Sequence, residues 1–196
     1  MLIVVNTWKR AKILAETIAT LNATRRPDSC LAVLDDATED WVAPEGVDHV
    51  WQLDAHSGAG AARYEALLRC RESSHEVFLV MDNDVQVSPG FDTEALDLWF
   101  AHRGRHPKCL GTPFHPALLH HTEREFDFGE YLFGTSCSGA MLFMDRSMVN
   151  HILWTMPRNL WDSMWDWTLG GYVGGFVKPK KSYATHVGHD EDALHP

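Results

Sequence analysis

The sequence contains few cysteines, and they lie far apart along the chain. None of the four, Cys30, Cys70, Cys109 and Cys137, belongs to a C-x-x-C pair. This spacing argues against a zinc site built from cysteines. A chain of 196 residues can bury a sizeable hydrophobic core, so it needs no disulfide framework. We therefore expect reduced cysteines, as in proteins of the cytoplasm.

Long hydrophobic runs are also missing. The chain opens with four apolar residues, 2–5, before the polar Asn6, and an apolar run such as residues 77–81 has the length of a strand. Such runs are too short for the hydrophobic segment of a signal peptide or for a membrane-spanning helix. We expect no membrane span and a cytoplasmic location.

Positive charge is scarce relative to negative charge. Lys and Arg number 17 against 27 Asp and Glu, which gives a formal net charge of −10. Binding along a nucleic acid backbone requires clustered Lys and Arg. Nucleic acid is therefore a disfavoured partner, unless a local basic patch lies within the acidic surface.

In the first half of the chain, apolar runs of strand length alternate with segments whose apolar residues recur at helical spacing. This alternation predicts an α/β fold with a mainly parallel sheet and helices on its faces, formed by a single domain. The expected strands are residues 2–5, 31–34, 49–53 and 77–81, and the expected helices are residues 10–21, 58–70 and 93–102.

The second half of the chain is less regular. Residues 114–135 contain several histidines and acidic residues but few periodic apolar positions, which predicts a long loop over the site. Nothing in this half indicates a linker or a second domain. After the loop we expect a strand at 138–144, helices at 147–154 and 161–172, and short closing strands at 176–177 and 183–186.

Two acidic clusters follow two of the expected strands. Asp35 and Asp36 end one strand, and Asp82, Asn83 and Asp84 end another. Ligands of parallel α/β sheets bind beyond the carboxyl ends of the strands, and we expect the two strands to be neighbours. Carboxylates suit Mg²⁺ or Mn²⁺, which would in turn hold a diphosphate. Each cluster alone is more typical of a turn than of a metal site.

Two further segments are candidates for the same site. The small residues 58–62 would let a helix begin close to a ligand, and Arg63 could then reach a phosphate. No Gly-Lys-Ser/Thr follows, so this is not a Walker A loop, and a small-residue helix face packed on the sheet is the alternative. His186, near a predicted closing strand, is a candidate ligand for an Mn²⁺-type ion.

Seven segments match, in order, the motifs of one enzyme family. Together they cover nearly the whole chain and resemble the family 2-type glycosyltransferases with the GT-A fold. The matches are IVVNTWKR (3–10) with P-T-x-N-R, VLDDATED (33–40) with V-V-D-D-G-S-T-D, HSGAGAARY (56–64) with N-x-G-x-x-x-A-R-N, VMDNDV (80–85) with L-D-x-D, GAMLF (139–143) with G-x-x-M-x-F-R, WDWTL (165–169) with E-D-x-x-L, and a closing HVG (186–188).

The resemblance implies an inverting transferase that uses Mn²⁺ or Mg²⁺ and a nucleotide-diphosphate sugar, with a UDP-sugar expected. It also implies a nucleotide-sugar half, residues 1–90, and an acceptor half, residues 91–196. The resemblance also assigns roles at matched positions. The nucleoside pocket would be lined by Thr7, Arg10, Asp35 and Asp36, with Asn83 in the same donor-binding set. Arg63 would face the diphosphate, Asp82 would meet the ribose or the metal, Asp84 and His186 would bind the metal, and Asp166 would be the general base.

The sequence departs from these motifs at His56, Tyr64 and Trp165. Trp165 replaces the acidic residue before Asp166, and Asp162 lies one helical turn away on the same face, so Asp162 is the alternative base. The chain resembles a minimal catalytic core. Its acceptor could be a saccharide, a lipid-linked glycan, a protein or, less expected from the charge, a modified DNA base.

Two other functions stay open at this stage. A nucleotidyltransferase that makes a nucleotide-sugar needs a glycine-rich loop near the N-terminus, and residues 6–10 contain no glycine. A non-catalytic carbohydrate-binding protein would suit the eight tryptophans, since aromatic rings stack on sugars, but it would not need a metal cluster together with Asp166.

Overall fold

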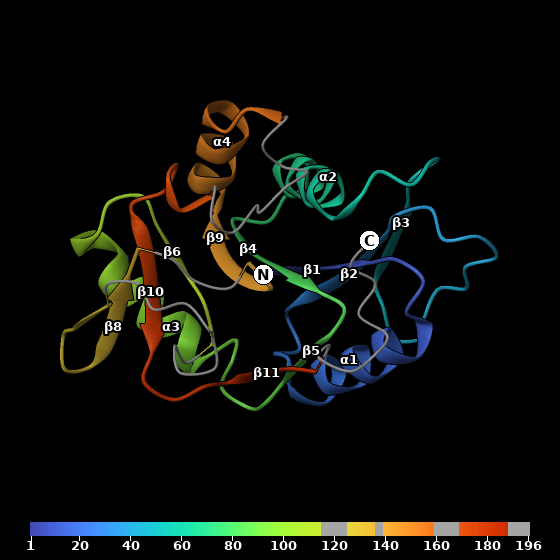
Figure 1. Ribbon diagram of the computed structural model, residues 1–196. Coiled ribbons are helices and arrows are strands. Elements are labelled where there is room, and N and C mark those ends of the chain that lie inside the picture. The colour runs from blue at the N-terminus through green and yellow to red at the C-terminus, as the bar shows by residue number, and fades with distance from the viewer. Residues whose placement is uncertain (115–124, 136–138, 159–168, 188–196) are drawn as a thin grey trace.

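The computed structural model describes residues 1–114, 125–135, 139–158 and 169–187 (Figure 1). Within these ranges, strands from both halves of the chain form one sheet. Its order is β3 (His49–Gln52), β2 (Cys30–Asp35), β1 (Leu2–Thr7), β4 (Val77–Asp82), β9 (Met141–Asp145), β6 (Cys109–Gly111), β10 (Gly175–Pro179), β8 (Tyr131–Gly134) and β7 (Glu125–Asp127).

The first four strands of this sheet are parallel to one another. β1 lies at their centre and pairs with β2 on one side and β4 on the other. Every residue of β1 is buried, because helices cover both faces of the sheet. This explains why β1 reads as a continuous apolar run rather than as an alternating pattern.

The rest of the sheet is mixed. β9 runs antiparallel to β4 and β6, β10 runs parallel to β6, and β8 runs antiparallel to β10 and β7. Seven of the nine described strands of this sheet therefore run in one direction, and β9 and β8 run in the other. The structure confirms the predicted α/β fold with a large, mostly parallel sheet.

Within the described residues, helices cover both faces of the sheet (Figure 1). Side chains of α1 (Ala11–Thr24) and α3 (Glu94–His102) pack in one hydrophobic cluster with Ile3 and Val5 of β1. Side chains of α2 (Ala59–Glu72) and α4 (Arg146–Thr155) pack in the other cluster with Leu2 and Val4. Alternate residues of β1 therefore face opposite helix layers, as the period of a strand requires.

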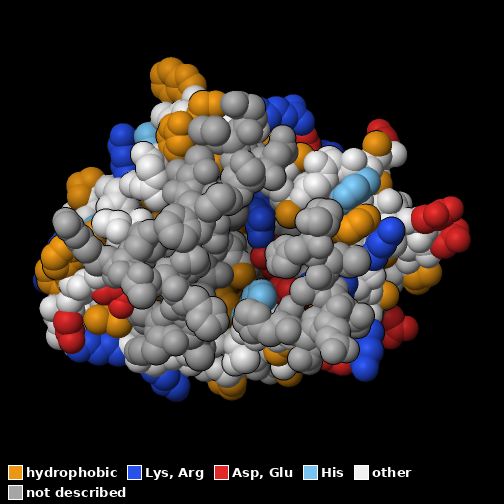
Figure 2. All heavy atoms as spheres, in the orientation of Figure 1, with side chains coloured by type: hydrophobic (Ala, Val, Ile, Leu, Met, Phe, Trp, Pro, Cys, Tyr) orange, Lys and Arg blue, Asp and Glu red, His pale blue; other side chains and the backbone are white. Residues whose placement is uncertain are grey.

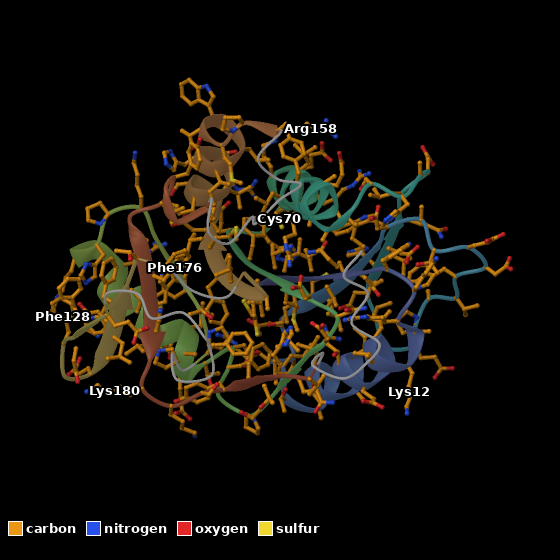
Figure 3. The ribbon with its side chains drawn as sticks, in the orientation of Figure 1. Lys12, Cys70, Phe128, Arg158, Phe176 and Lys180 are labelled. Atoms are coloured by element: carbon orange, nitrogen blue, oxygen red, sulfur yellow. The ribbon has the colours of Figure 1, made fainter. Side chains whose placement is uncertain are left out.

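Individual side chains follow this layering (Figure 3). Cys70 of α2 and Phe176 of β10 lie in the interior, and both are fully buried in the α2 and α4 cluster. Burial raises the pKa of the Cys70 thiol to about 12. Lys12 and Lys180, by contrast, are exposed. Within the described residues, no helix is both long enough and apolar enough to cross a bilayer.

A second, two-stranded sheet lies beside the large one. β5 (Val85–Val87) follows Asp84 directly and pairs antiparallel with β11 (Ala184–His186). The pairing sets His186 opposite Val85. This small sheet therefore brings the end of the described chain next to the acidic cluster that follows β4.

The predicted loop at residues 114–135 is wrong in its second part. Residues 125–134 form the antiparallel strands β7 and β8, which extend the sheet beyond β10. The residues of β7 are all exposed, so this edge strand leaves no apolar pattern in the sequence. Residues 115–124 lie outside the described ranges. A short 3₁₀ turn, η1 (Arg103–Arg105), and β6 also went unpredicted.

The predicted helix at residues 161–172 falls mostly outside the described ranges. Its last residue, Tyr172, lies in a turn, where its backbone N–H donates to the Leu169 carbonyl at 2.9 Å. Leu169 and Gly170 are helical, and Gly171 and Gly174 favour the turn that follows over a longer helix. The other expected strands and helices form close to their predicted bounds.

Candidate active site

The candidate site lies at the carboxyl ends of β2, β1 and β4. The register pairs Thr7 of β1 with Asp35 of β2, and Asn6 of β1 with Asp82 of β4. The prediction that the two acidic strands are direct neighbours is wrong, because β1 separates them. Consecutive strands extend from β1 towards β2 and β3, and the chain then crosses to the other side of β1 to form β4. Such a switch point opens a crevice for ligands.

Charged side chains of both signs gather over this edge. Figure 2 shows acidic, basic and histidine side chains together in a hollow near the centre of one face. Arg63 of α2 donates from Nη2 to both carboxylate oxygens of Asp82, each at 2.6 Å. Burial raises the pKa of Asp82, although the guanidinium of Arg63 acts in the opposite direction. The pair therefore holds a desolvated carboxylate at the mouth of the crevice.

Asp84 and His186 meet through the small β5–β11 sheet. The His186 Nε2 atom lies 3.2 Å from Asp84 Oδ1, and the backbone N–H of Val187 donates to the Asp84 carbonyl at 2.8 Å. Arg10, just before α1, donates to Asp84 Oδ2 at 2.7 Å. The structure thus brings together the predicted metal ligands Asp84 and His186, which lie far apart in the sequence.

The electrostatics of this trio favour ionised groups. Burial acts to raise the pKa of Asp84, but the hydrogen bond and charge of His186 and the charge of Arg10 outweigh it and lower that pKa. The hydrogen bond to Asp84 raises the pKa of His186, against the opposing effect of burial. An ionised Asp84 carboxylate suits a position where positive charge is to be held.

The donor atoms of Asp84 and His186 fit a divalent cation. Asp84 Oδ1 is buried, and His186 Nε2 lies 3.2 Å from it. A carboxylate oxygen and an imidazole nitrogen are an ordinary Mn²⁺ donor set. Among the described residues, no group of three or more His, Cys, Asp and Glu side chains forms a metal cage. Phosphate oxygens and water would complete the coordination.

Asp35 and Asp36 are bonded within the protein. Asp35 accepts hydrogen bonds from the backbone N–H and the hydroxyl of Thr38, at 2.7 and 2.6 Å, and from Gln52 Nε2 at 3.1 Å. Asp36 accepts bonds from the Ser57 backbone and hydroxyl and from the Gly58 backbone, each at 2.8 Å. Asp36 thus fixes the loop before α2, and Asp35 fixes the turn after β2. Their predicted contact with a nucleoside stays a prediction.

Thr7 and Asn83 hold the turn after β4 against α1. Asn83 Nδ2 donates to Thr7 Oγ1 at 2.8 Å, and Thr17 Oγ1 of α1 donates to the Asn83 carbonyl at 2.6 Å. The turn that carries Asp82 and Asp84 is therefore anchored from two elements. The predicted catalytic carboxylates Asp162 and Asp166 lie outside the described residues, so their position relative to this turn is not part of the structure.

Sequence reasoning assigned no role to three residues at this edge. Trp8 and His56 stack on each other, with ring centroids 4.0 Å apart and an interplanar angle of 13°. His56 Nδ1 also lies 2.8 Å from Asp36 Oδ2. Asn6, the last residue of β1 but one, is a buried amide. A polar residue that ends an apolar strand is the only sequence signal that could have pointed to Asn6.

Solved glycosyltransferase structures share this fold. S. aureus TarS 1–349 matches with a TM-score of 0.65 at 16% identity, over 95% of this chain and 60% of TarS 1–349. GalNAc-T7 with UDP, GalNAc and Mn²⁺ matches with a TM-score of 0.75 at 10% identity, over 100% of this chain and 44% of that one. The galactosyltransferase LgtC with donor and acceptor sugar analogues matches with a TM-score of 0.55 at 18% identity, over 91% and 73%.

These matches show that the chain has the GT-A fold, as the sequence motifs implied. No protein-family model matches the sequence, and no curated protein sequence matches it. Membership of family 2 therefore stays a prediction. The chain spans 60% of TarS 1–349 and 44% of GalNAc-T7, so what those proteins bind informs only the proposals below.

Proposed function

We propose that this chain is a metal-dependent, inverting glycosyltransferase that uses a nucleotide-diphosphate sugar, with a UDP-sugar as the expected donor. The observation that carries this proposal is the contact between His186 and Asp84 Oδ1 at the carboxyl edge of a GT-A sheet. Arg10 donates to the other carboxylate oxygen of Asp84. This arrangement supplies metal ligands and positive charge where a diphosphate would lie.

The bound molecules of the similar structures support this donor class. TarS 1–349 has been solved with UDP and with UDP-GlcNAc, and GalNAc-T7 with UDP, GalNAc and Mn²⁺. In our proposal Asp84 and His186 hold Mn²⁺ or Mg²⁺, Arg63 faces the diphosphate and Asp82 meets the ribose or the metal. Residues 1–90 form the nucleotide-sugar half and residues 91–196 the acceptor half, with His186 returning to the first half to complete the metal pair.

The proposed reaction is a direct displacement at the anomeric carbon. The acceptor hydroxyl oxygen forms a bond to that carbon while the bond from the carbon to the diphosphate oxygen breaks, and UDP leaves. The hydroxyl proton passes to a carboxylate, for which we propose Asp166, with Asp162 as the alternative. A bound divalent cation would offset the negative charge that develops on the departing diphosphate. Attack from the face opposite the leaving group inverts the anomeric configuration.

The acceptor is proposed only as a hydroxyl-bearing molecule. A saccharide, a lipid-linked glycan and a protein side chain all offer such a group. The formal charge of −10 disfavours a modified base in DNA, because the duplex backbone carries like charge. The donor side therefore offers the sharper first experiment.

The experiment measures UDP release from a set of UDP-sugars in Mn²⁺, in Mg²⁺ and in EDTA. A transferase without its acceptor slowly passes the sugar to water, so we expect metal-dependent UDP release that Asp84→Asn abolishes. A carbohydrate-binding protein would release no UDP. A nucleotidyltransferase would instead release pyrophosphate when it is given UTP and a sugar 1-phosphate. Pyrophosphate release in that second assay, without UDP release in the first, would contradict our proposal.

A further inference from the structure

The side-chain amide of Asn6 is buried at the edge of the candidate site. Its exposed fraction is 8%, and neither Nδ2 nor Oδ1 has a hydrogen-bond partner among the described residues. Buried polar side chains in native proteins are nearly always paired, because an unpaired amide loses its hydration without compensation. An amide left in this state requires an explanation other than the stability of the ligand-free fold.

The position of Asn6 in the sheet points to a ligand. Asn6 lies opposite Leu34 of β2 and opposite Asp82 of β4, on the strand where the order of the sheet reverses. The crevice at such a switch point opens beyond the carboxyl ends of the two diverging strands. Asn6 is one residue from the end of β1, close to where that crevice opens.

Asn6 lies on the face of the sheet that α2 covers, away from the proposed metal pair. Leu2 and Val4 pack in the cluster with α2, and strand alternation places Asn6 on the same face. Phe78 and Val80 place Asp82 on this face by the same rule, where it meets Arg63 of α2. The metal pair lies instead with Arg10, which precedes α1 on the opposite face.

The chemistry of the Asn6 amide suits a nucleobase better than a phosphate. An amide is neutral and offers one acceptor oxygen and two N–H donors, which match a flat ring edge that carries adjacent donor and acceptor groups. Trp8, two residues further along the chain, stacks on His56, and both rings are at least partly exposed. Aromatic faces of this kind stack on heteroaromatic bases. The cationic side chains that a diphosphate requires are those of Arg10 and Arg63, which pair with Asp84 and Asp82.

We infer that Asn6 is a specificity-determining residue that hydrogen-bonds the base of the donor nucleotide. This inference rests on the proposed function, because it takes a nucleotide as the ligand. Asn6 occupies the position at which the P-T-x-N-R motif has proline, a residue without a hydrogen-bonding side chain. The contact is therefore a property of this sequence rather than of the motif that it resembles.

The test uses two effects of opposite sign in one variant. Asn6→Leu keeps the branched shape and the number of side-chain heavy atoms and removes the unpaired amide, so we expect the melting temperature of the ligand-free protein to rise. The same change removes the base contact, so we expect the dissociation constant for UDP in Mn²⁺ to rise about tenfold. The affinity for inorganic pyrophosphate in Mn²⁺ should not change, because pyrophosphate has no base. Asn6→Val repeats the test with a smaller side chain that suits a strand.

Ser29 provides a matched control. Its side chain is 6% exposed, and its Oγ has no hydrogen-bond partner among the described residues, but it precedes β2 at the opposite end of the strands. Ser29→Ala should leave UDP affinity unchanged. The control thus separates removal of a buried unpaired group in general from loss of a base contact.

Three results would overturn the inference. Unchanged UDP affinity in both Asn6 variants would show that the amide does not contact the nucleotide. A lower melting temperature with unchanged UDP affinity would assign Asn6 a structural role. An equal loss for UDP and pyrophosphate would place the contact on the diphosphate. If the wild-type protein binds neither UDP nor pyrophosphate in Mn²⁺, the proposed function fails and the inference falls with it, which is a different result from the other three.

Discussion

The two acidic clusters at the carboxyl edge of the sheet differ in the partners that hold them. Asp35 and Asp36 accept hydrogen bonds mainly from neutral groups, most of them backbone N–H groups and hydroxyls of nearby loops. Asp82 and Asp84 pair instead with the cationic side chains of Arg63 and Arg10, and Asp84 also with His186.

This difference separates a cluster that the fold holds in place from one whose partners can be exchanged. Backbone donors are fixed by the fold, so a carboxylate that they saturate cannot turn towards a ligand without breaking several bonds. Arginine and histidine side chains can rotate away and exchange a carboxylate for a phosphate or a metal. Adjacent acidic residues after a strand can therefore stabilise a loop in one place and form a binding site in another.

The largest expected effect lies outside both clusters, in the chemical step. We expect Asp166→Asn to lower kcat by a factor of roughly 10²–10⁴ while UDP and Mn²⁺ still bind, because a general base contributes about that much. Asp162→Asn should be milder. Steady-state kinetics and UDP calorimetry on both variants check this. An inactive Asp162→Asn beside an active Asp166→Asn would assign the base to Asp162, and an NMR finding of retained anomeric configuration would exclude direct displacement.

Removal of one charge from the structural cluster should affect stability most. Asp36→Asn leaves one oxygen to accept bonds that two oxygens accept now, so donors among Ser57, Gly58 and His56 lose their partner. We expect the free energy of unfolding to fall by about 2–4 kcal/mol, from one or two unsatisfied groups. Urea denaturation measures this. Asp84→Asn should cost less, and the reverse order would contradict the division between the clusters.

The smallest effect is expected at Asp48, a carboxylate away from the site. Asp48 accepts a bond from the Leu31 backbone at 2.7 Å and pairs with Arg25 at 2.8 Å. The backbone bond, followed by Arg25, lowers the pKa of Asp48. A lowered pKa stabilises the fold above the ordinary value of the carboxyl group, and this stabilisation is lost as the pH falls through the lowered pKa.

Asp48→Asn should therefore cost less than about 1 kcal/mol at neutral pH, as for an exposed ion pair, and nothing in strong acid. Unfolding measured between pH 7 and pH 3 checks the sign, and a cost that grows towards low pH would contradict it. Nucleotide affinity should not change in this variant.

Much of the fold could be predicted because parallel strands that are buried on both faces consist of consecutive apolar residues. β1 and β4 are buried on both faces, so their bounds follow from composition alone. β5 and β6 have three residues each, too few for any period, and the exposed β7 has no apolar face. Their pairing depends on distant strands, which a local pattern does not describe.

The sequence could suggest candidate residues of the site, but it could not predict which side chains pair with one another. The motifs identified Asp84 and His186, and the structure places them together. Spacing could not show that Arg10 would bond Asp84, or that loop donors would saturate Asp36, because those partners come from other elements. Asn6 escaped notice because one polar residue after an apolar run also marks an ordinary strand end.

The central claim is that Asp84 and His186 hold a divalent cation that in turn holds the donor. Calorimetry of UDP binding in Mn²⁺ and in EDTA tests it most directly, on the wild type, on Asp84→Asn and on Asp48→Asn as the control. We expect Mn²⁺ to strengthen UDP binding by roughly tenfold or more in the wild type and in Asp48→Asn, and to have no effect in Asp84→Asn. Equal UDP affinity of the wild type in Mn²⁺ and in EDTA would contradict the claim.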